Sequence, residues 1–412
     1  MVDNGCDATG NSLPSPSSPL NVLVFSKIPI APAYGGNRQR IRTLLAELQQ
    51  RHSVTFALIP SRQMRDTDMA AHREFFGPDR FHAMRRSKFP EFMFDVNALR
   101  RKGLTRVFGK TLSRNVDYVF DRSLERACRD IIEEVRPDVV IIEYVHFSRI
   151  LTWVQDGTYK VIDTHDAFWH EFNPSAERNG LLRADAILAI QDREADGFRA
   201  LLGTDAKTLV FTVSHIVAEQ GIIETDACTG ASFIGSYFDA NNASLRALIA
   251  NVMPLVLAKR PDFKLHVIGD VGRAVPDYPY VVKHGRVEVI ADALANAPIL
   301  ANYIVEGTGI KIKLLDAMKM GVPCVSTVLG AEGLTSQYAD GVRIASDDNQ
   351  FAEELTALFD NALRRATLSK AAVEASERWN EQQRSALHAA IENGMSPAAW
   401  AAQTNSIAAV AS

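Results

Sequence analysis

The chain has 412 residues, of which 47% are hydrophobic and 23% charged, and its formal net charge is −4. This length suits two large domains, and the composition excludes a collagen, a coiled coil or a wholly disordered chain. No apolar run reaches the roughly 18 residues of a membrane-spanning helix. The four cysteines form no CxxC pair, which excludes a cysteine-built zinc site and favours a cytoplasmic protein. Residues 1–20 are rich in Ser, Pro, Gly and Asn and lack an apolar core, so we expect a disordered tail rather than a secretion signal.

Short apolar runs separated by helical stretches follow the tail. A helix over residues 38–51 is predicted by Ile41, Leu44, Leu45 and Leu48, which have the spacing of an amphipathic helix. Runs that are apolar throughout predict strands covered on both faces, as in parallel sheets. The first half is therefore predicted to be a doubly wound α/β sheet. Its predicted strands span residues 21–26, 53–60, 138–144, 160–166, 184–191 and 208–214.

The second half repeats this alternation. We expect strands over residues 232–237, 264–270, 280–283, 299–305 and 322–328, and helices over residues 244–259, 310–320 and 351–393. The polar stretch 218–230 between the halves is predicted to be a hinge. These patterns predict a first domain over residues 21–217, a second over residues 218–375, and C-terminal helices over residues 376–412 that pack back toward the first domain.

The charge is unevenly distributed. Residues 62–129 carry 16 Lys and Arg against 9 Asp and Glu, while the rest of the chain is acidic. Phenylalanines and methionines are interleaved with the basic residues of 81–110. This pattern is typical of a peripheral site for an anionic membrane, but also of buried aromatics beside a solvated charged face. Nucleic acid is not supported as a partner, because the chain has no zinc finger, RNA-binding aromatic signature or basic tail.

A glycine pair follows the first predicted strand and opens the first helix. Gly35 and Gly36 let the backbone approach a ligand, and the N–H groups of a helix start attract anions. Arg38 and Arg40 add positive charge. The segment is neither a GxGxxG nor a Walker motif, and a tight strand-to-helix turn is the alternative interpretation.

The segment 306–316, EGTGIKIKLLD, also follows a strand and opens a helix. Lys311 and Lys313 lie at the mouth of this turn, where a diphosphate could meet a lysine and helix N–H groups together. Asp316, about two turns into the helix, could accept hydrogen bonds from ribose hydroxyls. The alternative is a solvated helix with ordinary surface charges.

Polar residues end another strand of the first half. Asp163, His165 and Asp166 are expected at the carboxyl edge of the sheet, with His165 in the cleft. A metal site built from these residues and His170 is conceivable, but no second cluster of ligands supports it.

The string GTGIKIKLLDAM, followed by GVPCVST and GAEGL, resembles the GT-B glycosyltransferases of family 4, the group 1 type. YGGNRQRIR and VIDTHDAF are similar to that family's glycine-rich loop and histidine-bearing loop. The resemblance covers Asn21 to Trp379 and implies two Rossmann-like domains that face a central cleft.

The resemblance further implies a hexosyltransferase that moves a sugar from a nucleotide sugar to an acceptor hydroxyl with retention. A glycan or lipid-linked acceptor, a role in polysaccharide or glycoconjugate assembly, and no metal or cofactor would follow. Such an enzyme would be cytoplasmic, or peripheral on the cytoplasmic face of the membrane.

Residue roles are implied in the same way. His165 and Lys311 would be catalytic, and Asn37, Arg38 and Asp166 would lie on the acceptor side. The implied donor-binding residues are Gly35, Gly36, Gly285, Arg286, Val287, Glu306, Thr308, Gly309, Ile310, Lys311, Lys313 and Asp316.

Two departures leave alternatives open. The family's Glu-x7-Glu element has Asp316 as its second acid and Thr308 where the first is expected, with Glu306 nearby. In addition, FDANN after Ser236 carries no base where the family has an Arg/Lys pair. The alternatives are a non-catalytic GT-B relative acting as a binding or scaffolding subunit, and another GT-B enzyme such as a sugar-nucleotide epimerase or a phosphorylase.

Overall fold

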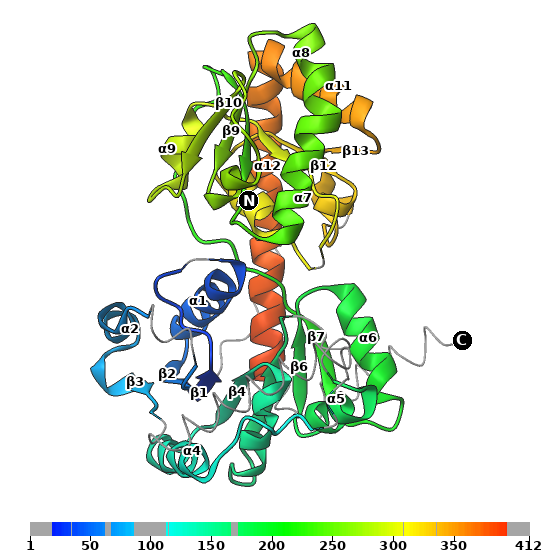
Figure 1. Ribbon diagram of the computed structural model, residues 1–412. Coiled ribbons are helices and arrows are strands. Elements are labelled where there is room, and N and C mark those ends of the chain that lie inside the picture. Colours follow the sequence, from blue (N-terminus) through cyan, green and yellow to red (C-terminus); the bar gives the residue numbers. More distant parts are fainter. Residues whose placement is uncertain are drawn as a thin grey trace, which may run out of the picture.

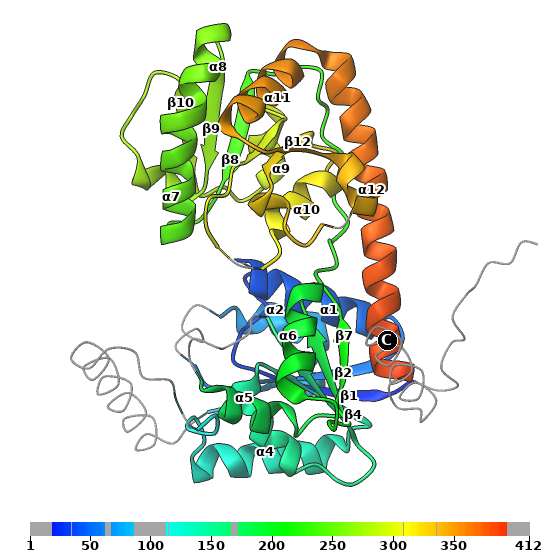
Figure 2. The ribbon, with the colours of Figure 1, turned by 90° about the vertical axis from the view of Figure 1, so that its right-hand side faces the viewer.

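The computed structural model describes residues 19–33, 35–61, 67–85, 113, 115–165, 172–307, 309–334 and 336–393. The tail, Asp166, His170, Thr308 and most of the basic segment 81–110 lie outside these residues. Each half of the chain forms one parallel sheet, and the two domains stand one above the other (Figures 1 and 2). The predicted doubly wound α/β architecture is confirmed.

The first sheet has seven parallel strands in the order β3-β2-β1-β4-β5-β6-β7. Alternate residues of β1 and β4 enter the cores on its two faces, and these strands are buried throughout apart from Asn21. That burial explains their continuous apolar sequence. The strands are β1 (Asn21–Ser26), β2 (Ser53–Leu58), β3 (Phe81–Ala83), β4 (Val139–Glu143), β5 (Tyr159–Asp163), β6 (Ala186–Ala189) and β7 (Leu209–Thr212).

Helices cover both faces of this sheet. On one face pack α4 (Arg122–Val135), α5 (Pro174–Leu181) and α6 (Asp192–Leu202). On the other pack α1 (Gly36–Gln49), α2 (Met69–Phe76) and the end of the last helix, α12 (Ala362–His388). The strand β3 and the helix α2 were not predicted. β3 is a three-residue edge strand, and its sequence contains no apolar run that would indicate it.

The second sheet has six parallel strands in the order β10-β9-β8-β11-β12-β13. They are β8 (Gly230–Ile234), β9 (Lys264–Ile268), β10 (Val281–Gly285), β11 (Leu300–Asn302), β12 (Cys324–Thr327) and β13 (Val342–Ala345). Its remaining helices are α7 (Asp239–Ala247), α8 (Met253–Lys259), α9 (Ile290–Ala295), α10 (Ile312–Lys319) and α11 (Asp348–Asp360).

Two predicted helices differ from the observed ones. The helix predicted over residues 244–259 begins at Asp239 and passes through a π-helical turn, 248–252, directly before α8. Pro254 follows in the first turn of α8, and a widened turn accommodates its missing N–H. The helical stretch 351–393 is divided at Asn361, whose side chain caps α12 by accepting from Arg364 N.

The helix α12 runs from the second domain into the first (Figure 1). Its side chains hold the crossing segment that links β7 to β8. Trp379 Nε1 donates to His215 O at 2.7 Å, and Ser214 N donates to Gln383 Oε1 at 2.7 Å. The side chain of Asn380 bonds both backbone groups of Val217 at 2.8 Å. The segment between β7 and β8 is therefore hydrogen-bonded to one side of α12 over residues 214–217.

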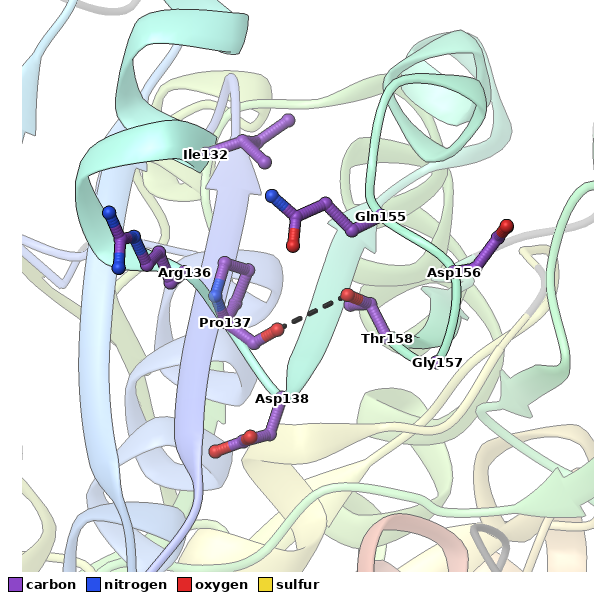
Figure 3. Close-up of a pocket in the computed structure, with 8 residues that line it drawn as sticks. All are labelled: Ile132, Arg136, Pro137, Asp138, Gln155, Asp156, Gly157 and Thr158. Carbon is purple, nitrogen blue, oxygen red and sulfur yellow. Dashed lines mark hydrogen bonds between the residues drawn. The ribbon is translucent and has the colours of Figure 1, made fainter.

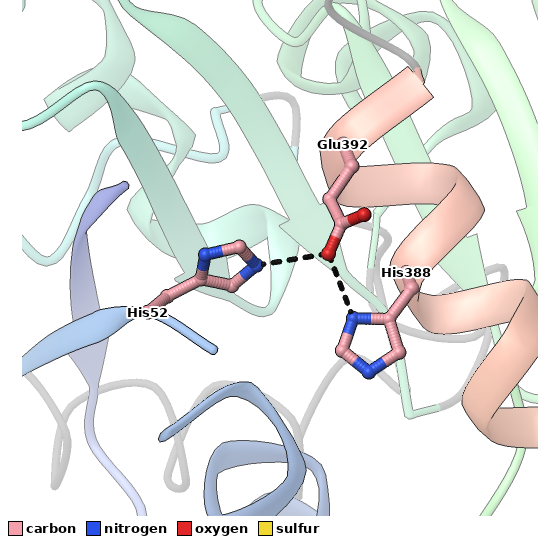
Figure 4. Close-up of side chains that lie close together, drawn as sticks. All are labelled: His52, His388 and Glu392. Carbon is pink, nitrogen blue, oxygen red and sulfur yellow. Dashed lines mark hydrogen bonds and ion pairs between the residues drawn. The ribbon is translucent and has the colours of Figure 1, made fainter. Parts of the chain in front are cut away.

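A polar cluster fastens the end of α12 to the first domain (Figure 4). His388 lies between Glu47 and Glu392, at 3.0 and 3.1 Å, and His52 Nε2 is 3.2 Å from the same Glu392 oxygen. The ligand atoms of His52, His388 and Glu392 are close enough to share a metal ion. However, the Arg51 guanidinium already lies 3.4 Å from that oxygen and supplies positive charge. We therefore interpret the cluster as a structural clasp.

Among the described residues, no helix is both long enough and apolar enough to cross a membrane.

Replacing Asn380 by Ala is expected to lower stability. The change leaves the buried N–H and C=O of Val217 without their partners, which costs about 2–4 kcal/mol. Thermal unfolding should show a clearly lower melting temperature than for Glu381→Ala, an exposed neighbour on the same helix. Equal melting temperatures for the two variants would contradict the role of Asn380.

Candidate functional site

The helix starts that were predicted to bind a donor, one in each domain, come together where the two domains meet. Gly35 precedes α1 with a positive φ of 87°, and Gly36 is its first residue. A Cβ added at Gly36 would lie 3.0 Å from Cδ1 of Ile312, the first residue of α10. The two segments therefore lie against each other, and a side chain at position 36 would require the end of the Ile312 side chain to shift by a few tenths of an ångström.

The start of α10 has the features of an anion site. Lys311 occupies the position before the helix, and its side chain makes no cap hydrogen bond to the helix N–H groups. Its ammonium donates to Gly309 O at 2.5 Å. Burial lowers the pKa of Lys311, and the nearby Glu332 carboxylate opposes this effect. An arriving anion would restore the charged form, because a neighbouring negative charge favours it.

Lys313 lies deeper than the sequence suggests. Its ammonium donates to Ile234 O at 3.0 Å and to Asn241 Oδ1 at 3.4 Å, and it stands 5.3 Å above the ring of Phe233. Burial, together with the charge of Lys311, lowers the pKa of Lys313 to about 8. This lysine ties α10 to the turn between β8 and α7, so its positive charge lies within the wall of the cleft.

The other predicted donor residues follow strand ends of the second sheet. Asp316 lies on α10, and its side chain is 17% exposed. Glu306 is exposed beyond β11, whereas Ile310 is half-buried in the domain core. Arg286 forms a 2.5 Å ion pair with Asp270. The segment 285–287 ends β10, which is three strands away from β11 in the sheet order.

A buried charge network lies on the first-domain side. Arg40 is fully buried and forms a bidentate pair with Asp163, at 2.5 and 2.7 Å. Its third hydrogen bond goes to Val213 O at 2.8 Å. We expected Arg40 to add charge for a ligand, and this expectation was wrong, because the side chain is buried and paired. Asp163 ends β5 at the carboxyl edge of the sheet, as expected, but its side chain is buried there against Arg40. The guanidinium needs a buried carboxylate, and Asp163 supplies one inside the core.

His165 contacts a residue that sequence reasoning missed. Its Nε2 lies 2.7 Å from Glu143 Oε2, and its ring stacks on Tyr144 with centroids 4.6 Å apart. Burial raises the pKa of Glu143 to about 8, although the charge of Arg40 opposes this effect. Burial therefore favours the protonated carboxyl, which can donate to His165 Nε2. The sequence did contain a sign of this contact. Glu143 ends β4, which pairs with β5, and His165 follows β5, so the two residues come to the same edge of the sheet.

Glu143, Asp163 and His165 place ligand atoms close enough for a metal ion. However, both oxygens of Asp163 already accept from the Arg40 guanidinium, which occupies the cation position. Asp166 and His170, the remaining candidates, lie outside the described residues.

On the acceptor side, Asn37 and Arg38 belong to the first turn of α1. Asn37 Oδ1 accepts from Arg38 N, and the Arg38 guanidinium donates to Pro32 O at 3.1 Å. These bonds hold the loop that precedes the helix against its first turn.

A separate pocket opens at the amino ends of β4 and β5 (Figure 3). Thr158 Oγ1 donates to Pro137 O across it at 3.3 Å, and Arg136 and Asp138 line its rim. Ligands of open parallel sheets bind at the carboxyl ends of the strands, where the predicted residues gather. We therefore place the candidate site at the starts of α1 and α10 and not in this pocket.

Comparisons with known proteins bear on the family of the second domain and on the fold. Residues 230–361 match the family described as Glycosyl transferases group 1. An uncharacterized 44.6 kDa protein in the cps region of Klebsiella pneumoniae is 30% identical over 139 residues, which are 30% of this chain and 35% of that protein. The match thus spans about a third of the relative's length.

Solved structures resemble the whole two-domain arrangement. TarM superimposes with a TM-score of 0.62 at 11% identity over 89% of this chain and 98% of its own. A mutant of TarM from S. aureus, in complex with Fondaparinux, alpha-GlcNAc-glycerol and UDP, has a TM-score of 0.51 at 14% identity. This match covers 66% of the present chain and 59% of the TarM mutant's chain.

HepE from Anabaena, in complex with UDP and glucose, has a TM-score of 0.53 at 12% identity over 88% of this chain and 98% of its own. At these identities the likenesses establish the fold. The resemblance predicted from the sequence is confirmed: the chain has the GT-B glycosyltransferase fold, and its second domain matches the group 1 glycosyl transferases.

Proposed function

We propose that the protein transfers a sugar, a hexose, from a nucleotide sugar to an acceptor hydroxyl. The observation that carries this proposal is the approach of Gly36 to Ile312 beside Lys311. It brings together two helix starts whose N-cap residues, Gly35 and Lys311, make no side-chain cap hydrogen bond. A diphosphate at this point would meet N–H groups from both domains and a lysine. Closure of the domains over the donor would exclude water from the reacting bond.

Uridine is the base that we propose. The TarM mutant and HepE were both solved with UDP, and HepE also with glucose. Asp316 would accept hydrogen bonds from the ribose hydroxyls, and the segment 285–287 would bond the base through backbone groups. The shorter Asp in place of the family's Glu leaves less reach, so the orientation of this carboxylate becomes more important.

The chemistry that we propose needs no protein nucleophile and no metal. The leaving diphosphate would take the acceptor proton on the face from which it departs, which gives retention. Lys311 and the helix N–H groups would stabilise the negative charge that develops on it. His165, held by Glu143 and stacked on Tyr144, would border the transferred sugar from the first domain.

Replacing Lys311 by Ala tests the donor site. We expect UDP affinity to fall at least about tenfold, since a charge-assisted hydrogen bond contributes roughly 1.5–3 kcal/mol. UDP release from UDP-sugars by the purified protein should fall with it, while the melting temperature stays close to that of the unaltered protein.

The matched control is Lys259→Ala, an exposed lysine on α8 that is paired only loosely, at 3.8 Å, with Glu353. If both variants bind UDP as the unaltered protein does, Lys311 is not in the site. If the unaltered protein binds UDP but releases none from any UDP-sugar, the non-catalytic alternative is favoured.

Replacing His165 by Ala separates sugar contacts from nucleotide contacts. Turnover should fall on the order of 10²-fold, the effect of losing one polar group at a reacting centre, while UDP affinity changes less than about threefold. Steady-state kinetics and calorimetric titration with UDP measure the two effects. Equal losses of turnover and affinity, with a lower melting temperature, would assign His165 a structural role.

The acceptor is proposed to be anionic and membrane-linked, for example in polysaccharide assembly, because the basic residues cluster in the first domain's sequence. The protein should co-sediment with anionic vesicles at low salt and less at high salt. Changing Arg100, Arg101 and Lys102 to Glu should weaken this binding, and Lys259→Glu should not. Absence of binding at low salt would favour a soluble acceptor.

A further inference from the structure

His215 is a buried histidine whose ring has no hydrogen-bond partner among the described residues. Its side chain is 1% exposed, and both ring nitrogens are shielded from solvent and unbonded. Burying polar atoms without partners is unfavourable, so native proteins rarely do it without a reason. Neither the fold nor the proposed chemistry uses this ring.

The ring points at the acid that we assign to the ribose. His215 Nε2 lies 3.7 Å from Oδ1 of Asp316, just beyond the about 3.2 Å limit of a good N–H···O hydrogen bond. The ring belongs to the crossing segment and the acid to α10 of the second domain. Their contact therefore joins the interdomain connection to the nucleotide side of the cleft.

The backbone around His215 is fixed, which sets the position of the ring. Its carbonyl accepts from Trp379, the N–H of Ser214 donates to Gln383, and Asn380 bonds both backbone groups of Val217. The carboxylate of Asp316, on a partly exposed side chain, is the partner that can turn. Closing the gap by less than about 1 Å would form the hydrogen bond.

We propose that His215 is a positioning residue of the donor site, which holds one oxygen of Asp316 so that the other accepts from a ribose hydroxyl. This inference rests on the proposed function. Nε2–H donates to one carboxylate oxygen, and the remaining lone pairs face the nucleotide.

The test compares UDP with 2′,3′-dideoxy-UDP, which lacks both ribose hydroxyls. For His215→Leu, which removes both nitrogens at similar volume, calorimetric titration should show about five- to tenfold weaker UDP binding. Binding of the dideoxy compound should change less than about twofold. His215→Gln, which restores an N–H near the position of Nε2, should recover most of the UDP affinity.

Asp316→Asn is the matched partner variant. It should remove the preference for UDP over the dideoxy compound, and adding His215→Leu to it should have little further effect, since residues that act through one contact are not additive. If His215→Leu melts at a much lower temperature, His215→Asn serves in its place, because its amide lies nearer the position of Nδ1 and does not reach Asp316.

Equal losses of affinity for both compounds, or additive effects of the two substitutions, would overturn the inference and leave the proposed function standing. Absence of UDP binding by the unaltered protein would instead overturn the proposed uridine donor, and the inference with it.

Discussion

The ion pair between Arg40 and Asp163 connects the parts of the first domain that face the cleft. Arg40 lies on the first turns of α1, Asp163 ends β5, and Val213, which accepts the third hydrogen bond of Arg40, begins the crossing to the second domain. Removing one partner of such a buried pair costs about 3–5 kcal/mol, because the other charge is left uncompensated. The glycine pair, His165 and His215 are each within a few residues of this network. Their relative placement therefore depends on it.

This network also decides where the positive charge of the cleft comes from. The guanidinium of Arg40 is buried in the core and paired with Asp163, so it is not available to a ligand. Lys311, Lys313 and the N–H groups at the two helix starts can supply it instead. Lys313 supplies its charge from inside the wall, with a pKa lowered to about 8, which a bound diphosphate would raise again. Fixed charge and backbone dipoles of this kind stabilise a leaving group without reorganisation.

Much of the fold was predictable, because strands buried on both faces are continuous apolar runs. β1, β4, β8, β9, β11 and β12 lie where those runs are, and the segments that follow them gather at the carboxyl edges. Short edge strands such as β3 were missed, because few of their residues are fully buried and their sequences therefore need no continuous apolar run. The site was only partly predictable. Glycines and lysines next to strand ends are visible locally, whereas Arg40 pairs with an acid 123 residues away. Neither that pairing nor the contact of His215 with Asp316 leaves a local signal in the sequence.

The central claim is that a nucleotide binds between the starts of α1 and α10. Hydrogen–deuterium exchange with and without UDP tests it most directly, because it reports backbone protection along the whole chain. The account predicts added protection at residues 35–41 and 309–316, together with the crossing at 213–217. Protection confined to the pocket at the amino ends of β4 and β5, or no change at either helix start, would contradict it.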